Sequence, residues 1–128
     1  MIKVGDSYQK DIVVLREDGR KFAALSGDFN PIHTDDEYAK NTRFGQCIVH
    51  GIYMGSIISG ILGNEFPGNG TIYLEQDLKF LKPVYYEKEI HIRVEVVEEM
   101  PRNRFRIKTD CFDEEDLLID GTAVVLYR

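Results

Sequence analysis

Apolar and polar residues alternate through most of the second half of the chain. The alternation runs through residues 71–84, 89–100, 104–112 and 117–128, and the turn-forming stretches PRN and DEED separate the later segments. A period of two residues puts apolar side chains on one face of a strand and polar side chains on the other. Together with an opening strand over residues 8–15, the pattern predicts about five strands, each with one solvated face.

A different pattern precedes these strands. Residues 48–62, IVHGIYMGSIISGIL, are apolar on nearly every side of a helix. A bilayer crossing needs about 20 apolar residues, so the segment predicts a buried helix and not a membrane span. Its small residues are poor helix formers and predict the close approach of another backbone layer, the sheet. These residues are Gly51, Gly55, Ser56, Ser59 and Gly60.

Two shorter helices are predicted in the first third of the chain. The stretch FAAL, which begins at Phe22, indicates one or two helical turns that end at Gly27, because glycine favours the position after a helix. The stretch TDDEYAKN opens with a capping residue and has acidic side chains at the positive end of a helix dipole. It predicts a helix over residues 35–41. A polar run, SGDFNPIHTDD, lies between the two helices.

A long apolar helix followed by four meandering antiparallel strands favours an α+β fold, in which a curved sheet wraps around the buried helix. The chain shows no internal repeat, low-complexity segment or linker, so we expect a single domain over residues 1–128. One open sheet leaves two edge strands with unpaired backbone groups. Pairing with a second copy would cover an edge, and we therefore expect a homodimer.

Composition excludes several classes of protein. Hydrophobic residues make up 43% of the 128 residues, enough for one core, and the net charge of −6 disfavours a general affinity for nucleic acid. We interpret a local basic stretch, residues 101–108, as a hairpin turn that enters an edge strand with its charges facing solvent. The polar start of the chain predicts no export signal, and hence a cytoplasmic location.

Neither the cysteines nor the glycine-rich turn predicts a metal or nucleotide site. Cys47 and Cys111 lie far apart without metal-site spacing, so we expect reduced thiols and no metal ion. The stretch FPGNG lacks the lysine and hydroxyl residue of a phosphate-binding loop. Five tyrosines are candidates for lining a ligand cavity or for a subunit contact, and the sequence does not separate these roles: Tyr38, Tyr53, Tyr73, Tyr85 and Tyr86.

The polar run at residues 26–36 carries the candidate chemistry. Asp28 and His33 are five positions apart, and the proline after Asn30 biases that residue away from helical geometry, so the loop can turn sharply. A carboxylate beside an imidazole suits general acid–base catalysis on a bound water, whereas an asparagine can only orient a polar group. A purely structural role is the alternative, because Asp and Asn are common turn formers.

The second candidate is CIVHG, residues 47–51, which leads into the apolar helix. The start of a helix leaves N–H groups unpaired and carries partial positive charge, so the N–H of Gly51 could hold an oxyanion. Cys47 and His50 have the spacing of a nucleophile and its base at i, i+3. No orienting carboxylate follows, so we interpret Cys47 as a core residue and His50 as a structural or wall residue.

These motifs resemble those of one family. FAALSGDFNPIHTDDEYA, from Phe22, and FGQCIVHGIYMGSIISGIL, from Phe44, are similar to the MaoC-like, hydratase 2 family of hot-dog-fold proteins, in particular the (R)-specific enoyl-CoA hydratases. GNGTIYLEQDLKFLKPV is similar to the family's first long strand and proline bend. The resemblance covers most of the chain. One departure is that relatives follow the bend with a hydrophobic-x-Gly-Asp turn, where this chain has Glu87 and Lys88.

The resemblance implies a hot-dog fold, in which the helix lies inside a curved sheet, and a homodimer as the minimal unit. It implies that Asp28 and His33 hold a catalytic water and that the backbone N–H of Gly51 binds the thioester oxygen of the substrate. We therefore expect reversible hydration of a trans-2-enoyl-CoA to the (R)-3-hydroxyacyl-CoA, with an acyl-CoA as partner and no cofactor. Asn30 is a further candidate for substrate binding.

Two other functions stay open at this point. One is a hot-dog acyl-CoA thioesterase, and the other is a non-catalytic acyl-CoA-binding module. The presence of both Asp28 and His33 argues against the binding module, because binding alone needs neither proton carrier. The acyl chain length depends on the depth of the pocket, for which Ser59, Leu62 and the last strand are candidates.

Overall fold

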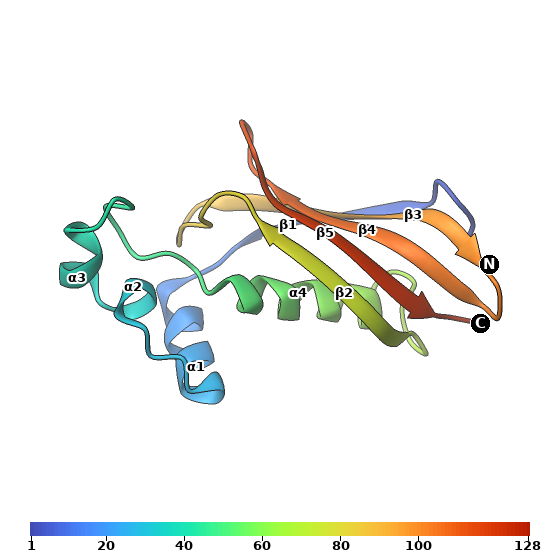
Figure 1. Cartoon of the computed structure of the whole chain (residues 1–128), viewed down its shortest axis with the longest axis horizontal. Helices are drawn as coiled ribbons and strands as arrows, with labels where there is room; N and C mark the ends of the chain where they lie inside the picture. The colour runs from blue at the N-terminus through green and yellow to red at the C-terminus, as the bar shows by residue number, and fades with distance from the viewer.

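The structure is a computed structural model that describes all 128 residues, and its main layer is a sheet of five antiparallel strands (Figure 1). The sheet order is β1-β3-β4-β5-β2. In chain order the elements are β1 (Ser7–Val13), α1 (Arg16–Ser26), α2 (Pro31–Thr34), α3 (Asp36–Lys40), α4 (Gly51–Asn64), β2 (Ile72–Phe80), β3 (Glu89–Met100), β4 (Arg104–Phe112) and β5 (Leu117–Leu126).

The five predicted strands are confirmed, but the meander is shorter than predicted. β3, β4 and β5 follow one another in the sheet, whereas β2 pairs with β5 and not with β3. The chain therefore crosses from one side of the sheet to the other between β2 and β3. As a result, β1 and β2 form the two edges and β4 is the central strand.

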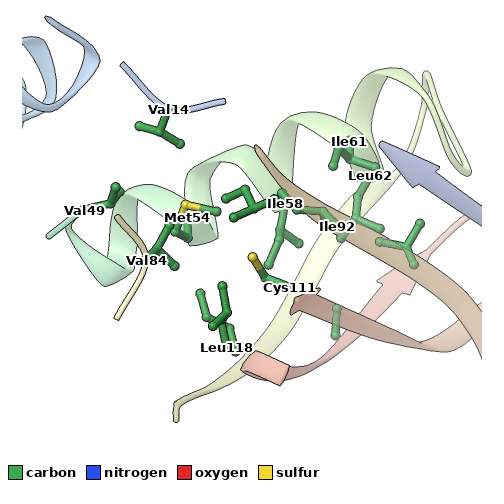
Figure 2. Packing of buried hydrophobic residues seen from close by; sticks show 14 of the residues in the cluster. Val14, Val49, Met54, Ile58, Ile61, Leu62, Val84, Ile92, Cys111 and Leu118 are labelled. Carbon is green, nitrogen blue, oxygen red and sulfur yellow. The ribbon is translucent and has the colours of Figure 1, made fainter. Parts of the chain in front are cut away.

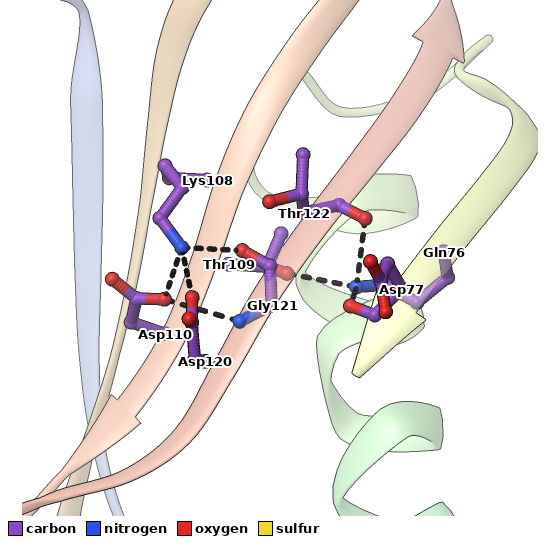
Figure 3. Close-up of polar contacts among 8 residues, drawn as sticks. All are labelled: Gln76, Asp77, Lys108, Thr109, Asp110, Asp120, Gly121 and Thr122. Atoms are coloured by element: carbon purple, nitrogen blue, oxygen red, sulfur yellow. Dashed lines mark hydrogen bonds and ion pairs between the residues drawn. The ribbon is translucent and has the colours of Figure 1, made fainter. Parts of the chain in front are cut away.

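The basic stretch does not enter an edge strand, so that interpretation was wrong. It leads into β4, whose basic side chains lie on the face opposite the core and pair with acids of neighbouring positions. Arg106 Nε donates to Glu98 at 2.8 Å. Lys108 Nζ donates to Asp110 at 2.9 Å and to Asp120 on β5 (Figure 3). These pairs neutralise the charges of Arg106 and Lys108 within the sheet.

The helix α4 packs against one face of the sheet and begins three residues later than predicted (Figure 1). Ile48 and Val49 are held in extended backbone, because their N–H groups donate to the carbonyls of Ile32 and Val84. Helical hydrogen bonding therefore starts only at His50, the N-cap residue. The last helical residue is Asn64.

The core lies between α4 and the sheet. Figure 2 shows side chains of α4 that point toward side chains from the strands and from the segment after β2. Apolar side chains removed from water supply most of the free energy that holds the two layers together. The side chains from α4 are Met54, Ile58, Ile61 and Leu62, and those opposite include Val84, Ile92, Cys111 and Leu118.

The small residues of α4 divide into two groups. A Cβ at Gly51 would lie 2.6 Å from the ring of Phe80, and one at Gly55 would lie 3.1 Å from Leu78, so these two glycines do allow β2 to approach closely. Gly60 has no neighbour within 4 Å. It lies on the side of the helix where Ile52 is also exposed. The prediction is therefore confirmed for the first two glycines and wrong for the third.

The helices α1, α2 and α3 gather beyond one end of the sheet, beside the start of α4, and both chain termini lie at the other end (Figure 1). α1 has 11 residues and is longer than predicted. The backbone N–H of Arg16, its first residue, donates to the carboxylate of Glu87. This contact joins residues far apart in the chain, so a local sequence pattern could not predict it. α1 ends at Gly27, which has the expected left-handed conformation with φ 79°. No helix is both long and apolar enough to cross a bilayer.

Candidate active site

Short side-chain to backbone hydrogen bonds shape the loop between α1 and α2. Asp28 Oδ1 accepts from the N–H of Asn30 at 3.2 Å, and Asn30 Oδ1 accepts from the N–H of Ile32 at 3.3 Å. Asn30 has non-helical backbone angles and caps α2, and Pro31 occupies the first helical turn. The predicted sharp turn is thus confirmed, and the amide of Asn30 serves the loop itself.

His33 lies on α2 and is fixed by contacts from two distant segments. Its Nδ1 lies 2.9 Å from the carbonyl oxygen of Ile48, and its own carbonyl accepts from the hydroxyl of Tyr86 at 3.0 Å. Because a carbonyl oxygen can only accept, Nδ1 carries the hydrogen. In the neutral ring, Nε2 therefore keeps a free lone pair and can accept a proton.

The contact between Tyr86 and His33 depends on a glycine in α1. A Cβ built at Gly19 would overlap the hydroxyl group of Tyr86. The absence of a side chain at Gly19 lets the tyrosine ring pass close to α1 and reach the backbone of α2. One glycine therefore supports the position of a candidate catalytic residue 14 positions later in the chain.

Asp28, His33 and Gly51 line one cavity of about 380 Å³, and His50 forms part of its wall. A carboxylate oxygen of Asp28 and ring nitrogens of His33 and His50 all lie within 4.8 Å of one another. A single water molecule can bridge polar groups at such a separation. The cavity wall also contains apolar side chains from several segments: Phe44, Ile48, Val49, Ile52, Phe80, Leu81, Pro83, Val84 and Ile119.

The environment of His33 favours its neutral form. Burial lowers the pKa of His33 below its ordinary value of 6.5, and the nearby imidazole of His50 lowers it further. The bond to the carbonyl of Ile48 and the negative charge of Asp28 act in the opposite direction, but the net shift is downward. A neutral imidazole with a free Nε2 has the protonation state that a general base requires.

Gly51 is the first residue of α4, and its N–H donates to no other group of the protein. An unpaired N–H at the start of a helix attracts negative charge. The ring of Phe80 lies against Gly51 and also lines the cavity. A carbonyl oxygen that enters the cavity therefore meets a free donor beside an apolar wall.

The structure excludes the Cys47–His50 pair as a nucleophile and base. Burial raises the pKa of Cys47 to about 11, and Asp36 contributes to the increase, so the thiol stays protonated near neutral pH. The ring of His50 bonds to the carbonyl of Asp28 and not to sulfur. Cys47 belongs to the core, and the interpretation of His50 as a wall residue is confirmed.

The other predicted site residues do not reach the cavity. Leu62 is buried in the core between α4 and the sheet, Ser59 is half-buried on α4, and Asn30 caps α2. Phe80 and Ile119 line the cavity in their place. The alternation of β2 and β5 places both residues on the face of the sheet toward α4, which was the available indication. Alternation does not show which part of α4 a strand residue lies opposite.

Two basic residues at the cavity wall were not predicted from the sequence. Arg43 and Lys82 lie at the cavity wall, in a turn before α4 and in the bend after β2. Lys82 pairs with Asp116 at 3.0 Å, whereas the guanidinium of Arg43 lies over the ring of Phe44. Both residues are on irregular segments, whose position relative to the cavity only the folded chain defines.

Comparisons with known proteins agree with this arrangement. Residues 3–115 match the family described as MaoC like domain. A 3-hydroxybutyryl-CoA dehydratase of Methylorubrum extorquens is 40% identical over 105 residues, which are 81% of this chain and 67% of that protein. An (R)-specific enoyl-CoA hydratase of Rhodospirillum rubrum is 36% identical over 126 residues, which are 98% of this chain and 88% of that protein.

A solved structure extends the agreement to the fold. The (R)-hydratase of Aeromonas caviae matches with a TM-score of 0.95 and 36% identity, and the match covers 99% of this chain and 98% of that chain. The five-stranded sheet around α4 corresponds to the hot-dog fold that the motifs implied. The family match over most of the chain and the similarity in structure lead to one conclusion: this chain belongs to the MaoC-like family.

Proposed function

We propose that this protein catalyses the reversible hydration of trans-2-enoyl-CoA to (R)-3-hydroxyacyl-CoA. The observation that carries the proposal is that Asp28, His33 and Gly51, which come from three separate segments, line the same cavity. Relatives named as an (R)-specific enoyl-CoA hydratase and a 3-hydroxybutyryl-CoA dehydratase support the same reaction class. The reaction needs a proton carrier, a bound water and stabilisation of a thioester oxygen, and the cavity offers groups suited to each.

In the proposed mechanism, the carboxylate of Asp28 and Nε2 of His33 hold one water between them. The water oxygen adds to C3 of the enoyl group, one water proton passes to this pair, and the pair returns a proton to C2, so that one water is added in total. Negative charge develops on the thioester oxygen as the C2–C3 double bond is attacked. The free N–H of Gly51 stabilises that charge, and a preorganised donor is effective because it needs no rearrangement during the reaction.

The apolar wall suits the remainder of the substrate. Phe80, Val84 and Ile119 line the cavity beside the candidate catalytic residues, and we assign the acyl chain to this side. These side chains exclude water from the cavity, and the exclusion of water strengthens the electrostatic interactions of the site. The assignment replaces Ser59 and Leu62, which the sequence suggested for the acyl pocket and which do not line this cavity.

Incubation of the protein with crotonyl-CoA tests the proposal. We expect loss of the enoyl absorbance without release of free thiol, and an (R)-configured product by chiral analysis. Thiol release would instead indicate a thioesterase, and unchanged ligand would indicate a binding module. Because general acids and bases typically contribute about 10²–10⁴-fold, Asp28→Asn and His33→Ala should each lower kcat by that order. Asp77→Asn removes an exposed carboxylate outside the cavity and should leave kcat unchanged.

We further propose that the protein acts as a homodimer. The edge strand β2 exposes apolar side chains at Ile72, Leu74 and Phe80, and α4 exposes Ile52 nearby. An edge strand with unpaired backbone groups and apolar neighbours favours association with a second sheet edge. Association through this side would cover both the open edge and the face of α4 that no other element contacts.

A further inference from the structure

We propose that His50 is a positioning residue, which ties the loop of Asp28 to the start of α4 so that the carboxylate, His33 and the N–H of Gly51 keep a fixed arrangement. The inference rests on the proposed hydratase function and assigns a role within that site. His50 is the N-cap residue of α4 and directly precedes Gly51. Its side chain contacts both other parts of the site.

The first contact joins His50 to the loop. Its Nε2 lies 3.0 Å from the carbonyl oxygen of Asp28. Since the carbonyl can only accept, Nε2 carries the hydrogen and donates it. The hydrogen bond holds the backbone of Asp28 and thereby restricts where its carboxylate can lie. No other side chain of the protein donates to this carbonyl oxygen.

The second contact joins His50 to the imidazole of His33. The two rings are stacked with centroids 4.0 Å apart and planes at 25°. On another side, the ring of Phe22 meets His50 edge-on at 4.9 Å. His50 is 1% exposed, so neighbours on all sides fix its ring. One rigid side chain thus contacts the loop that carries Asp28 and the ring of His33.

The chemistry of His50 explains why a histidine occupies this buried position. Nδ1 is buried and has no hydrogen-bond partner in the protein. A buried polar atom without a partner costs about 1–3 kcal/mol, which an apolar residue of similar shape would avoid. The imidazole is therefore a poor choice for packing alone. An apolar residue would lack the Nε2–H, which in His50 donates to the carbonyl oxygen of Asp28.

Two amide substitutions separate the donor from the rest of the side chain. In His50→Gln, the terminal NH₂ can lie near the position of Nε2 and donate to the carbonyl of Asp28. In His50→Asn, the amide is one methylene shorter and cannot reach it. Asparagine is also a preferred N-cap residue, so it supports the start of α4. The two variants therefore match in chemistry and differ in reach.

We expect His50→Asn to lower kcat at least 10-fold, since a misplacement of about 1 Å can cost 10²-fold. KM should change much less, and His50→Gln should recover most of kcat. Equal losses in the two variants, or wild-type kcat in both, would overturn the proposal. Thermal unfolding checks that both variants fold. If His50→Asn does not fold, His50→Phe replaces it, because it keeps an aromatic ring and lacks the donor.

A second measurement is independent of activity. Nitrogen NMR of ¹⁵N-histidine-labelled protein reports which ring nitrogen of His50 carries the hydrogen, with His50→Gln used to assign the signal. The proposal requires the Nε2–H form, and an Nδ1–H form would overturn it. If the wild-type protein does not hydrate crotonyl-CoA, the proposed function fails, while this spectrum still decides whether His50 donates to Asp28.

Discussion

The protonation state of His33 determines the pH range in which the proposed reaction can run. Burial lowers its pKa below 6.5, so most of the rings are neutral at pH 6.5 and above. If the neutral ring is needed, kcat/KM should fall on the acidic side with a midpoint below pH 6.5. A pH profile of kcat/KM with crotonyl-CoA checks this. An acidic limb centred above 6.5 would contradict the assigned role.

An internal control for this prediction is the titration of His33 itself. The negative charge of Asp28 raises the pKa of His33, so Asp28→Asn should move that pKa further down. NMR titration of the ring in the variant measures the change without any need for turnover. A pKa that rises in Asp28→Asn would show that the two side chains do not face each other.

At the scale of residues, the sequence identified candidate residues that line one cavity, but not the contacts that surround them. Asp28, His33 and Gly51 could be named because a local motif fixes the residue types that handle protons and oxyanions. The bond between His50 and Asp28, 22 positions apart, could not be predicted, because no local pattern encodes it. Leu62 was misplaced for the same reason: an apolar helix residue can face a cavity or the core.

Among the elements, the contact of β4 with β5 leaves no space at Gly121. A Cβ at this position would overlap the backbone oxygen and the hydroxyl of Thr109, the same hydroxyl that accepts from Gln76 at 2.9 Å (Figure 3). Overpacking of this kind typically costs about 1–3 kcal/mol, and Gly121→Ala should fall at the upper end because backbone cannot move aside.

Urea unfolding measures that loss as a difference in the free energy of unfolding. Gly63→Ala is the matched control, since it lies within α4 with no neighbour within 4 Å. There the added methyl group should be neutral or stabilise by up to about 1 kcal/mol, because alanine is the better helix former. Equal effects of the two substitutions would show that β4 and β5 are less closely packed than described.

A second contact between elements should make stability depend on pH. His91 on β3 bonds to the carboxylate of Asp11 on β1 at 2.6 Å, and this bond raises the pKa of His91 above 6.5. A raised pKa in the folded state stabilises the fold fully below 6.5, and the contribution is lost as the pH rises through the raised value. His91→Gln should therefore destabilise the protein below pH 6.5, as long as Asp11 is still ionised, and should have little effect above the raised pKa of His91.

The free energy of unfolding of the wild-type protein and of His91→Gln, measured with urea at pH values below and above 6.5, checks this. Asp11→Asn should reproduce the effect, and the double substitution should add little to either single one, because all three break the same contact. A difference that grows with pH would have the wrong sign for a protonated histidine.

The limits of prediction differ at the scale of elements. Alternation identified the four later strands, because apolar and polar side chains point to opposite faces along most of their length. It did not reveal that β2 pairs with β5, since alternation has no information about strand order. The turn after Val84 shows a related limit: Glu87 has φ 65°, a conformation that favours glycine, and its side chain holds the start of α1.

For the whole molecule, the proposed dimer makes a direct prediction. Ile72→Lys puts a charge on the exposed edge strand β2 and should shift the protein from dimer to monomer. The molar mass measured by light scattering across a concentration series checks this. Val13→Lys places the same charge on the opposite edge strand, β1, where Val13 is also exposed, and should leave the mass unchanged. A monomeric wild-type protein would refute the dimer.

The missing side chain at Gly19 has an evolutionary consequence. Because the hydroxyl of Tyr86 occupies the space that a Cβ would need, neither position can change freely while the other is kept. Homologues that carry alanine or a larger residue at the first position should have a side chain smaller than phenylalanine at the second, because ring carbons of Tyr86 would also lie within 3 Å of the added Cβ. Two sites separated by about half of the chain would then vary as a pair, although neither lines the cavity.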